Sequence, residues 1–179
     1  GGSQGAEIIN NIILDCLEDL LPQVQIIHQT GEKLYEDVKG RSNIVLNGNS
    51  FASRYRAFPF LNPVGLRMSA GAADIVVTRA GSTLFEIAGW EIPAIVIPFT
   101  TSNNDHSKKN AYSYARAGAG IVIEESNLTK SVFLQAVEEI TKNKQKSDEM
   151  KAKARAFLKT GASELIAREI IHIAESHEK

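Results

Sequence analysis

Three short polar segments hold the residues with which this chain could bind a charged ligand. They are Gly1-Gly2-Ser3-Gln4-Gly5-Ala6, Arg79-Ala80-Gly81-Ser82-Thr83-Leu84-Phe85-Glu86 and Asn103-Asn104-Asp105-His106-Ser107-Lys108-Lys109-Asn110-Ala111. The first opens a helical pattern. Glycines there let backbone amides approach an anion, and the amino end of a helix adds a partial positive charge. Phosphate or pyrophosphate is its natural ligand, although a tight turn or a remnant of cloning would have the same composition.

The second segment follows a strand-like run that ends at Thr78, so it opens at the carboxyl edge of a sheet. Ser82 and Thr83 could donate to phosphate oxygens through their hydroxyls and amides. The carboxylate of Glu86 could accept from two neighbouring ribose hydroxyls, because both hydroxyls are donors. Thr83 followed three positions later by Glu86 is equally the pattern of a helix capping box, and the residues alone leave both interpretations open.

The third segment follows the strand that ends in Pro98-Phe99, and it therefore opens at the same edge. Asp105, His106, Ser107 and Asn110 could contact a ligand there. Asp105 as a helix N-cap, with the lysines in solvent, explains the same residues. His28 closes another strand and could donate to a ligand, but a bond to a neighbouring carbonyl is the favoured interpretation.

The sequence gives little support for a metal site or for a reactive thiol. His172 and His177 are five positions apart, which does not place two imidazoles on one helix face, so we propose no metal ligand. The single cysteine, Cys16, lies among apolar residues at helical spacing, which predicts a buried, unreactive thiol.

The elements that must position these segments alternate between strand and helix, which predicts an α/β fold with a parallel sheet. Strands are expected at 24–28, 55–61, 74–78, 94–99 and 120–124, of which the third and fourth should be central. Helices are expected at 7–20, 65–72, 83–90, 106–117, 130–142, 147–158 and 162–176. Segment 39–54 is expected to be a loop with one short strand at 44–46.

Length and charge limit the function further. The 179 residues suit one domain, and 20 basic against 21 acidic residues leave no field that would draw the chain to nucleic acid. No apolar run reaches the roughly 18–20 residues of a membrane span, so we expect a cytoplasmic location. A glycine-rich turn normally follows a strand, so we expect that the first strand and an amino-terminal part are missing.

Together these segments resemble the C-terminal domain of MurG-like family 28 glycosyltransferases. The matching pieces occur in family order: the Gly-Gly-Ser-Gln-Gly-Ala loop, His28-Gln29-Thr30-Gly31, Phe60-Leu61, Ala73-Asp74, Arg79-Ala80-Gly81, Glu86, Pro93, Pro98-Phe99, Asp105-His106 and Asn110-Ala111. The resemblance implies the donor half of a GT-B enzyme, a single nucleotide-sugar-binding domain over 1–179. Its helices from about residue 144 would pack across one face or against the missing domain.

The resemblance also implies roles. UDP-N-acetylglucosamine would be the donor, transferred with inversion to a lipid-linked muramyl-peptide precursor of peptidoglycan at the inner face of the membrane. Its contacts would be Ser3, Gln4, Phe60, Leu61, Gly81, Ser82, Thr83, Glu86, His106 and Ser107, with Gly2, His28, Arg79, Asp105 and Asn110 nearby. The backbone at Phe60 and Leu61 would recognise uracil and Glu86 the ribose. The catalytic base would lie on the amino-terminal, acceptor-binding domain, and no cofactor is implied.

Two departures from the family pattern and two alternative functions stay open. The stretch from Arg79 to Glu86 is one residue shorter than in many members, so the roles of Ser82 and Thr83 could shift by one position. Ser107 stands where the family commonly has glutamine, which leaves the donor sugar open. The chain could also be a non-catalytic donor-binding subunit with a separate membrane partner, or a UDP-N-acetylglucosamine 2-epimerase, although the paired glutamates of that enzyme are absent.

Overall fold

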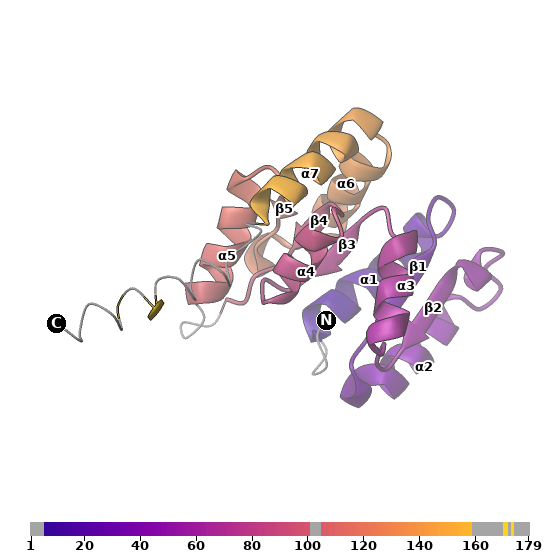
Figure 1. The fold of residues 1–179 in the computed structure, drawn as a ribbon. Coiled ribbons are helices and arrows are strands. Elements are labelled where there is room, and N and C mark those ends of the chain that lie inside the picture. Colours follow the sequence, from indigo (N-terminus) through magenta and orange to yellow (C-terminus); the bar gives the residue numbers. More distant parts are fainter. Residues whose placement is uncertain (1–5, 101–104, 159–169, 172, 174–179) are drawn as a thin grey trace.

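The computed structural model describes residues 6–100, 105–158, 170, 171 and 173. Helices and parallel strands alternate along the chain, which confirms the predicted α/β class (Figure 1). The strands are β1 Ile26–Gln29, β2 Tyr55–Phe58, β3 Val76–Thr78, β4 Ala94–Val96 and β5 Gly120–Val122. The helices are α1 Glu7–Leu20, α2 Tyr35–Val45, α3 Pro63–Ala72, α4 Thr83–Gly89, α5 Asp105–Arg116, α6 Lys130–Thr141 and α7 Lys144–Phe157. Short 3₁₀ turns occupy Glu32–Leu34, Ala52–Arg54 and Glu125–Asn127.

The strands form two parallel sheets, one with the order β1-β2 and one with the order β3-β4-β5. Strand β4 is paired on both sides, and its residues Ala94, Ile95 and Val96 are fully buried, as a parallel strand covered on both faces should be. The prediction that the strand at 74–78 is also central is wrong for the described residues. There, β3 pairs with β4 alone.

Helix α1 supplies the larger core, which reaches both sheets. Its apolar side chains recur at helical spacing, so that Ile9, Ile13 and Leu17 lie on one buried face. The same core includes Tyr55 of β2 and Ile95 of β4, and α1 also packs against α2 and α6. Burial of each such side chain contributes about 1.5–3 kcal/mol. The helix thereby ties the two sheets together.

The buried thiol predicted for Cys16 is confirmed. The residue lies in the core of α1 with no exposed surface. Burial raises the pKa of the thiol to about 11, so the thiolate is scarce near neutral pH.

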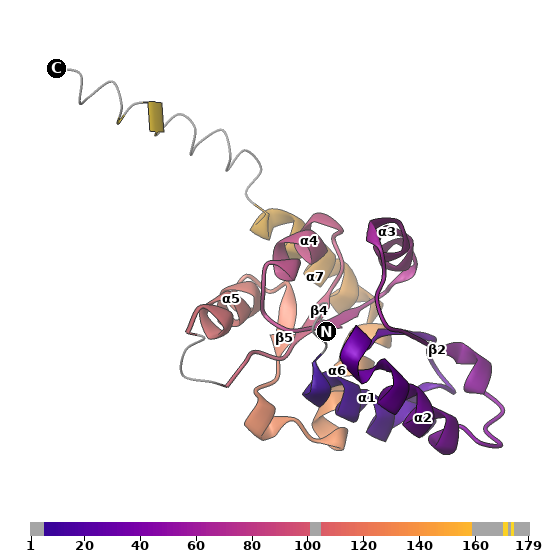
Figure 2. The same ribbon diagram turned by 90° about the horizontal axis from the view of Figure 1, so that it is seen from below.

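A second core lies on the opposite face, where α4, α5 and α7 cover the three-stranded sheet (Figure 2). Helix α7 packs against α4 and α6, and its Ala154 is fully buried. The ring of Tyr114 on α5 meets Phe157 edge to face at 5.0 Å between centroids. The first part of the predicted C-terminal helices thus packs across one face of this domain. The helix predicted at 162–176 lies almost wholly outside the described residues.

Replacing Tyr114 with phenylalanine should raise the free energy of unfolding by about 1 kcal/mol. The hydroxyl is buried and has no hydrogen-bond partner among the described residues, and burial raises its pKa to about 12. Removing an unsatisfied buried group recovers its desolvation cost. Tyr55→Phe is the matched control, because the Tyr55 hydroxyl is hydrogen-bonded to His28 at 2.9 Å and its loss should destabilise. Urea unfolding measures both, and a loss of stability in Tyr114→Phe would contradict the prediction.

The segment 39–54 differs from its prediction. Its first part belongs to helix α2, and Ile44, expected in a strand, is a helical residue that is 78% exposed. Glycine and asparagine lower the helix propensity of this stretch. The helix forms nevertheless, because the side chain of Val38 is buried in the core with α1. The Arg41 guanidinium also donates to Asn11 of α1 at 2.8 Å. The chain leaves the helix through Gly48, which has a φ of 76°.

Candidate functional site

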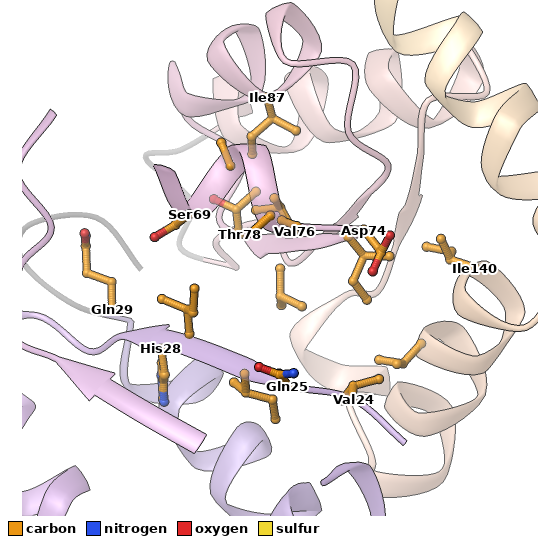
Figure 3. Close-up of a pocket in the computed structure, with 18 of the residues that line it drawn as sticks. Val24, Gln25, His28, Gln29, Ser69, Asp74, Val76, Thr78, Ile87 and Ile140 are labelled. Atoms are coloured by element: carbon orange, nitrogen blue, oxygen red, sulfur yellow. The ribbon is translucent and has the colours of Figure 1, made fainter. Parts of the chain in front are cut away.

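The candidate site lies where the chain leaves β1, β2 and β3 at their carboxyl ends. A cavity of about 1580 Å³ separates β1 from β3, and its lining includes Phe60, Leu61, Thr83 and Glu86. Figure 3 shows the two strands on opposite sides of this cavity, with Gln29 and Thr78 toward one end and Val24 and Asp74 toward the other. Four of the residues predicted to hold the donor therefore share one opening, although two come from the loop after β2 and two from helix α4.

The loop between β3 and α4 leaves two backbone donors available. Helix α4 begins at Thr83, and Ser82 is its N-cap residue but makes no side-chain capping bond. The capping box that the sequence allowed for Thr83 and Glu86 is therefore not formed, because Thr83 already lies inside the helix. The amides of Leu84 and Phe85 are bonded to Gly81 and Ser82, whereas those of Ser82 and Thr83 meet no acceptor in the described part of the chain.

Glu86 follows one turn later and lines the same cavity. Its side chain is exposed, and no cation or donor among the described residues pairs with it. The neighbouring Leu84 and Ile87 are buried, so the helix is fixed in rotation by its apolar face. The carboxylate is thus held at the opening by residues that have no polar role themselves.

The opposite wall comes from the loop after β2. Phe60 is 48% exposed, and the amide of Leu61 donates to Oε1 of Gln29 at 3.0 Å. Gln29 ends β1, so one side chain fixes the distance between two loop segments. Gln29 follows His28 in the sequence, and no role was predicted for it. A nucleobase that used the Leu61 amide would have to displace this amide oxygen.

Arg79 connects three loops at the carboxyl edge. Its Nη1 donates to the carbonyls of Ile97 at 3.2 Å and Pro98 at 3.1 Å, and it forms an ion pair with Glu125. The guanidinium also lies over the ring of Phe99, 4.3 Å from its centroid. These residues follow β3, β4 and β5. Arg79 therefore positions the loops through protein contacts, and its charge is already paired.

Glu125 was missed by sequence reasoning. It accepts hydrogen bonds from Thr100 and Arg79. Burial alone would raise the pKa of Glu125, but these two hydrogen bonds outweigh burial and hold the pKa below its usual value. Its place directly after the last strand, at the same sheet edge as the polar loops, is the signal that could have identified it.

The residues predicted on α5 lie apart from the cavity lining. Ser107 is buried, and its hydroxyl accepts from the amide of Phe99 at 3.2 Å, so it braces the loop after β4. His106 is exposed and Asn110 is half-buried. Helix α5 begins at Asp105, whose side chain lies outside the described part. Gly2, Ser3 and Gln4 also lie outside the described residues.

The imidazole of His28 is held by hydrogen bonds within the protein. Its Nε2 lies 2.9 Å from Oδ1 of Asn10, and its Nδ1 lies 2.9 Å from the Tyr55 hydroxyl. Asn10 uses its amide nitrogen for the carbonyl of Thr30 at 3.0 Å, which orients its oxygen toward the imidazole. The ring therefore donates from Nε2 and accepts at Nδ1, as a neutral histidine does. Burial lowers the pKa of His28 to about 4. Both ring nitrogens are thus occupied by the protein, which is the interpretation that the sequence favoured.

The described residues contain neither a metal-binding cluster nor a membrane-spanning helix. No cluster of three or more histidine, cysteine, aspartate or glutamate side chains there could hold a metal ion. None of the described helices combines the length and apolar character needed to cross a membrane.

Residues 1–167 match the glycosyltransferase family 28 C-terminal domain. A protein of Halothermothrix orenii named UDP-N-acetylglucosamine--N-acetylmuramyl-(pentapeptide) pyrophosphoryl-undecaprenol N-acetylglucosamine transferase is 36% identical over 143 residues, which cover 78% of this chain and 38% of that protein. A Xylella fastidiosa protein of the same name is 32% identical over 177 residues, 96% of this chain and 46% of the relative.

A solved structure shows the same likeness. The crystal structure of Acinetobacter baumannii MurG superposes on 96% of this chain and 48% of its own, with a TM-score of 0.78 and 25% identity. The chain thus spans less than half the length of the relatives it matches. The family match over nearly the whole chain, with the α/β fold and the loops gathered at the carboxyl edge, shows that this chain belongs to glycosyltransferase family 28 as a C-terminal domain.

Proposed function

We propose that this chain binds UDP-N-acetylglucosamine as the donor-binding half of an inverting transferase. The acceptor would be a lipid-linked muramyl-peptide of peptidoglycan synthesis, as the names of the relatives state for those proteins. The observation that carries the proposal is Glu86, an exposed carboxylate without a described partner at the opening it shares with Thr83, Phe60 and Leu61. A carboxylate in that place suits the two hydroxyls of a ribose.

Each loop has a role in this proposal. The amides and hydroxyls of Ser82 and Thr83, beside Gly81, donate to diphosphate oxygens, and so do the Ser3 hydroxyl and the backbone amides of Gly2, Ser3 and Gln4. Phe60 and Leu61 contact the uracil. His106 contacts the sugar together with Asp105 and Asn110, whereas the buried Ser107 supports this contact by holding the loop after β4 through the Phe99 amide. Arg79 and His28 act by holding this edge together, because Nη1 of Arg79 and both ring nitrogens of His28 are already bonded within the protein.

The reaction proposed is a single displacement at the anomeric carbon. An acceptor hydroxyl forms the new C–O bond while the bond to the UDP oxygen breaks, and its proton passes to a base on a separate acceptor-binding domain. The negative charge that develops on the diphosphate is stabilised by the oriented donors of Ser82 and Thr83. We propose no catalytic base, metal or cofactor in this chain, and a site of action at the inner membrane face through the acceptor-binding domain.

Calorimetry on the folded chain tests the proposal. We expect UDP and UDP-N-acetylglucosamine to bind and CDP and ADP to bind more weakly, while no sugar is transferred until an acceptor-binding partner is added. Equal binding of all four nucleotides would show a general phosphate site. Absence of heat for a chain whose circular dichroism shows a folded state would overturn the proposal.

Replacing Glu86 with glutamine or alanine should weaken UDP binding about 10-fold to 150-fold. This range corresponds to the roughly 1.5–3 kcal/mol of a hydrogen bond to a charged group. Asp74→Asn is the matched control, because Asp74 lines the opposite end of the same cavity (Figure 3). Thermal unfolding should change little in either variant, since Glu86 is exposed. A fall in stability with unchanged affinity would show that Glu86 stabilises helix α4 and does not bind UDP.

A further inference from the structure

The side chain of Gln29 uses a backbone donor that lies in the candidate site. The amide of Leu61 donates to Oε1 of Gln29 at 3.0 Å, while the Leu61 carbonyl meets no donor among the described residues. Figure 3 shows the Gln29 side chain extending from the end of β1 into the cavity that both residues line. The oxygen of a carboxamide is the same kind of acceptor as a carbonyl oxygen of uracil. Gln29 and a base that reaches Leu61 therefore compete for one N–H group.

The backbone on both sides of this hydrogen bond is fixed by other contacts. Thr30, directly after Gln29, is fully buried, and its amide donates to the carbonyl of Phe58 at 3.0 Å. Asn62, directly after Leu61, is the N-cap of α3, and its side chain accepts from a helix amide at 2.8 Å. These contacts hold the end of β1 and the loop after β2 independently of the Gln29 side chain. The direction of the Leu61 N–H bond is therefore set without Gln29.

Displacement of Gln29 from Leu61 requires movement of one side chain only. Gln29 is half-buried, and its unbranched side chain can turn to another rotamer while β1 keeps its pairing with β2. A base carbonyl that replaces Oε1 gives the Leu61 amide an equivalent acceptor, so the exchange leaves no backbone donor unbonded. The exchange nevertheless costs the hydrogen bond that Gln29 loses.

We propose that Gln29 is a latch on the nucleobase subsite, whose amide oxygen is exchanged for a carbonyl oxygen of the base when a uridine nucleotide binds at Leu61. This inference rests on the proposed function, because the base must reach Leu61. The latch keeps the Leu61 amide hydrogen-bonded before binding and raises the Kd of the donor and of the UDP product alike. It acts on the base alone and has no effect on phosphate or ribose contacts.

An NMR titration of the chain with UDP tests the latch through two variants of Gln29. Gln29→Met keeps the length of the side chain but removes the acceptor, so it should bind UDP about 2-fold to 10-fold more tightly, the range for one neutral hydrogen bond. Gln29→Glu offers the Leu61 amide a charged and stronger acceptor, so it should bind UDP more weakly than the parent chain. Before UDP is added, exchange of the Leu61 amide with solvent should be faster in Gln29→Met and slower in Gln29→Glu.

Gln25 and a ligand without a base provide the controls. Gln25 lines the same cavity just before β1, at the opposite end of the strand from Gln29 (Figure 3). Gln25→Met and Gln25→Glu therefore change the polarity and charge of the cavity without touching the Leu61 amide, and both should differ less from the parent than the matching Gln29 variants do. Ribose 5-phosphate carries no base, so the parent and Gln29→Met should bind it equally.

Three results would overturn the latch, and one of them also overturns the proposed function. Equal or weaker UDP binding by Gln29→Met would show that Gln29 supports the loop and does not compete with the base. An equal gain for ribose 5-phosphate would place the competition away from the base. Absence of UDP binding in both the parent and Gln29→Met, each folded by circular dichroism, would reject the proposed function and the latch together.

Discussion

Replacing Arg79 with alanine should lower the free energy of unfolding by about 3 kcal/mol or more. Arg79 and Glu125 are only 14% and 19% exposed, so the variant leaves a largely buried carboxylate without its cation. Breaking such a pair costs far more than losing a surface pair, because the remaining charge keeps its desolvation penalty. The carbonyls of Ile97 and Pro98 lose their donor as well. Urea unfolding at pH 7 measures the effect.

Two further arginine variants separate the causes. Arg79→Lys keeps the charge but lacks the planar, multiply donating group, so it should recover only part of the loss. Arg41→Ala removes a surface pair whose side chains are 43% and 64% exposed, and it should cost less than about 1 kcal/mol. Equal losses in Arg79→Ala and Arg41→Ala would contradict the role of Arg79. UDP binding by Arg79→Lys should also weaken, since the loops after β3, β4 and β5 are then held together by fewer hydrogen bonds.

Lowering the pH from 6.5 to 4 should remove about 3 kcal/mol of stability through His28 alone. The pKa of this imidazole is about 4 in the folded chain against 6.5 in a model peptide. The unfolded chain therefore binds the proton more tightly, and stability rises with pH across this window and is complete above it. The difference in pKa corresponds to about 1.4 kcal/mol for each pH unit. Denaturant unfolding at several pH values measures the slope.

A variant of His28 isolates this contribution from that of the carboxylates. His28→Gln keeps a donor and an acceptor between Asn10 and Tyr55, and its stability should vary less between pH 6.5 and 4 than that of the parent chain. Equal slopes in the parent and in His28→Gln would mean that His28 titrates normally.

The sequence predicted elements with strong local signals and missed contacts between distant residues. Helix α1 was predicted with its observed bounds, because its apolar spacing and the following Pro22 are local features. The position of Glu86 at the sheet edge follows in the same way from a strand that ends at Thr78. The hydrogen bond from Leu61 to Gln29 joins positions 32 apart, and no pattern along the chain specifies such a contact.

Helix α2 was missed because packing between distant residues decides its structure. Most of it was predicted as a loop, since Gly40 and Asn43 have low helix propensity, yet burial of Val38 against α1 selects the helix. The helix predicted from Thr83 begins at that residue, and this excludes the capping box that the sequence had left open.

The position of α1 has a consequence for how the molecule unfolds. Its side chains belong to the core that includes residues of both sheets, so neither sheet keeps its apolar cover once α1 detaches. Local opening of one sheet is then not independent of local opening of the other, because each requires the free energy of detaching the same helix. The two sheets behave as one cooperative unit despite the cavity between them, and amides far apart in the structure should share a single opening energy.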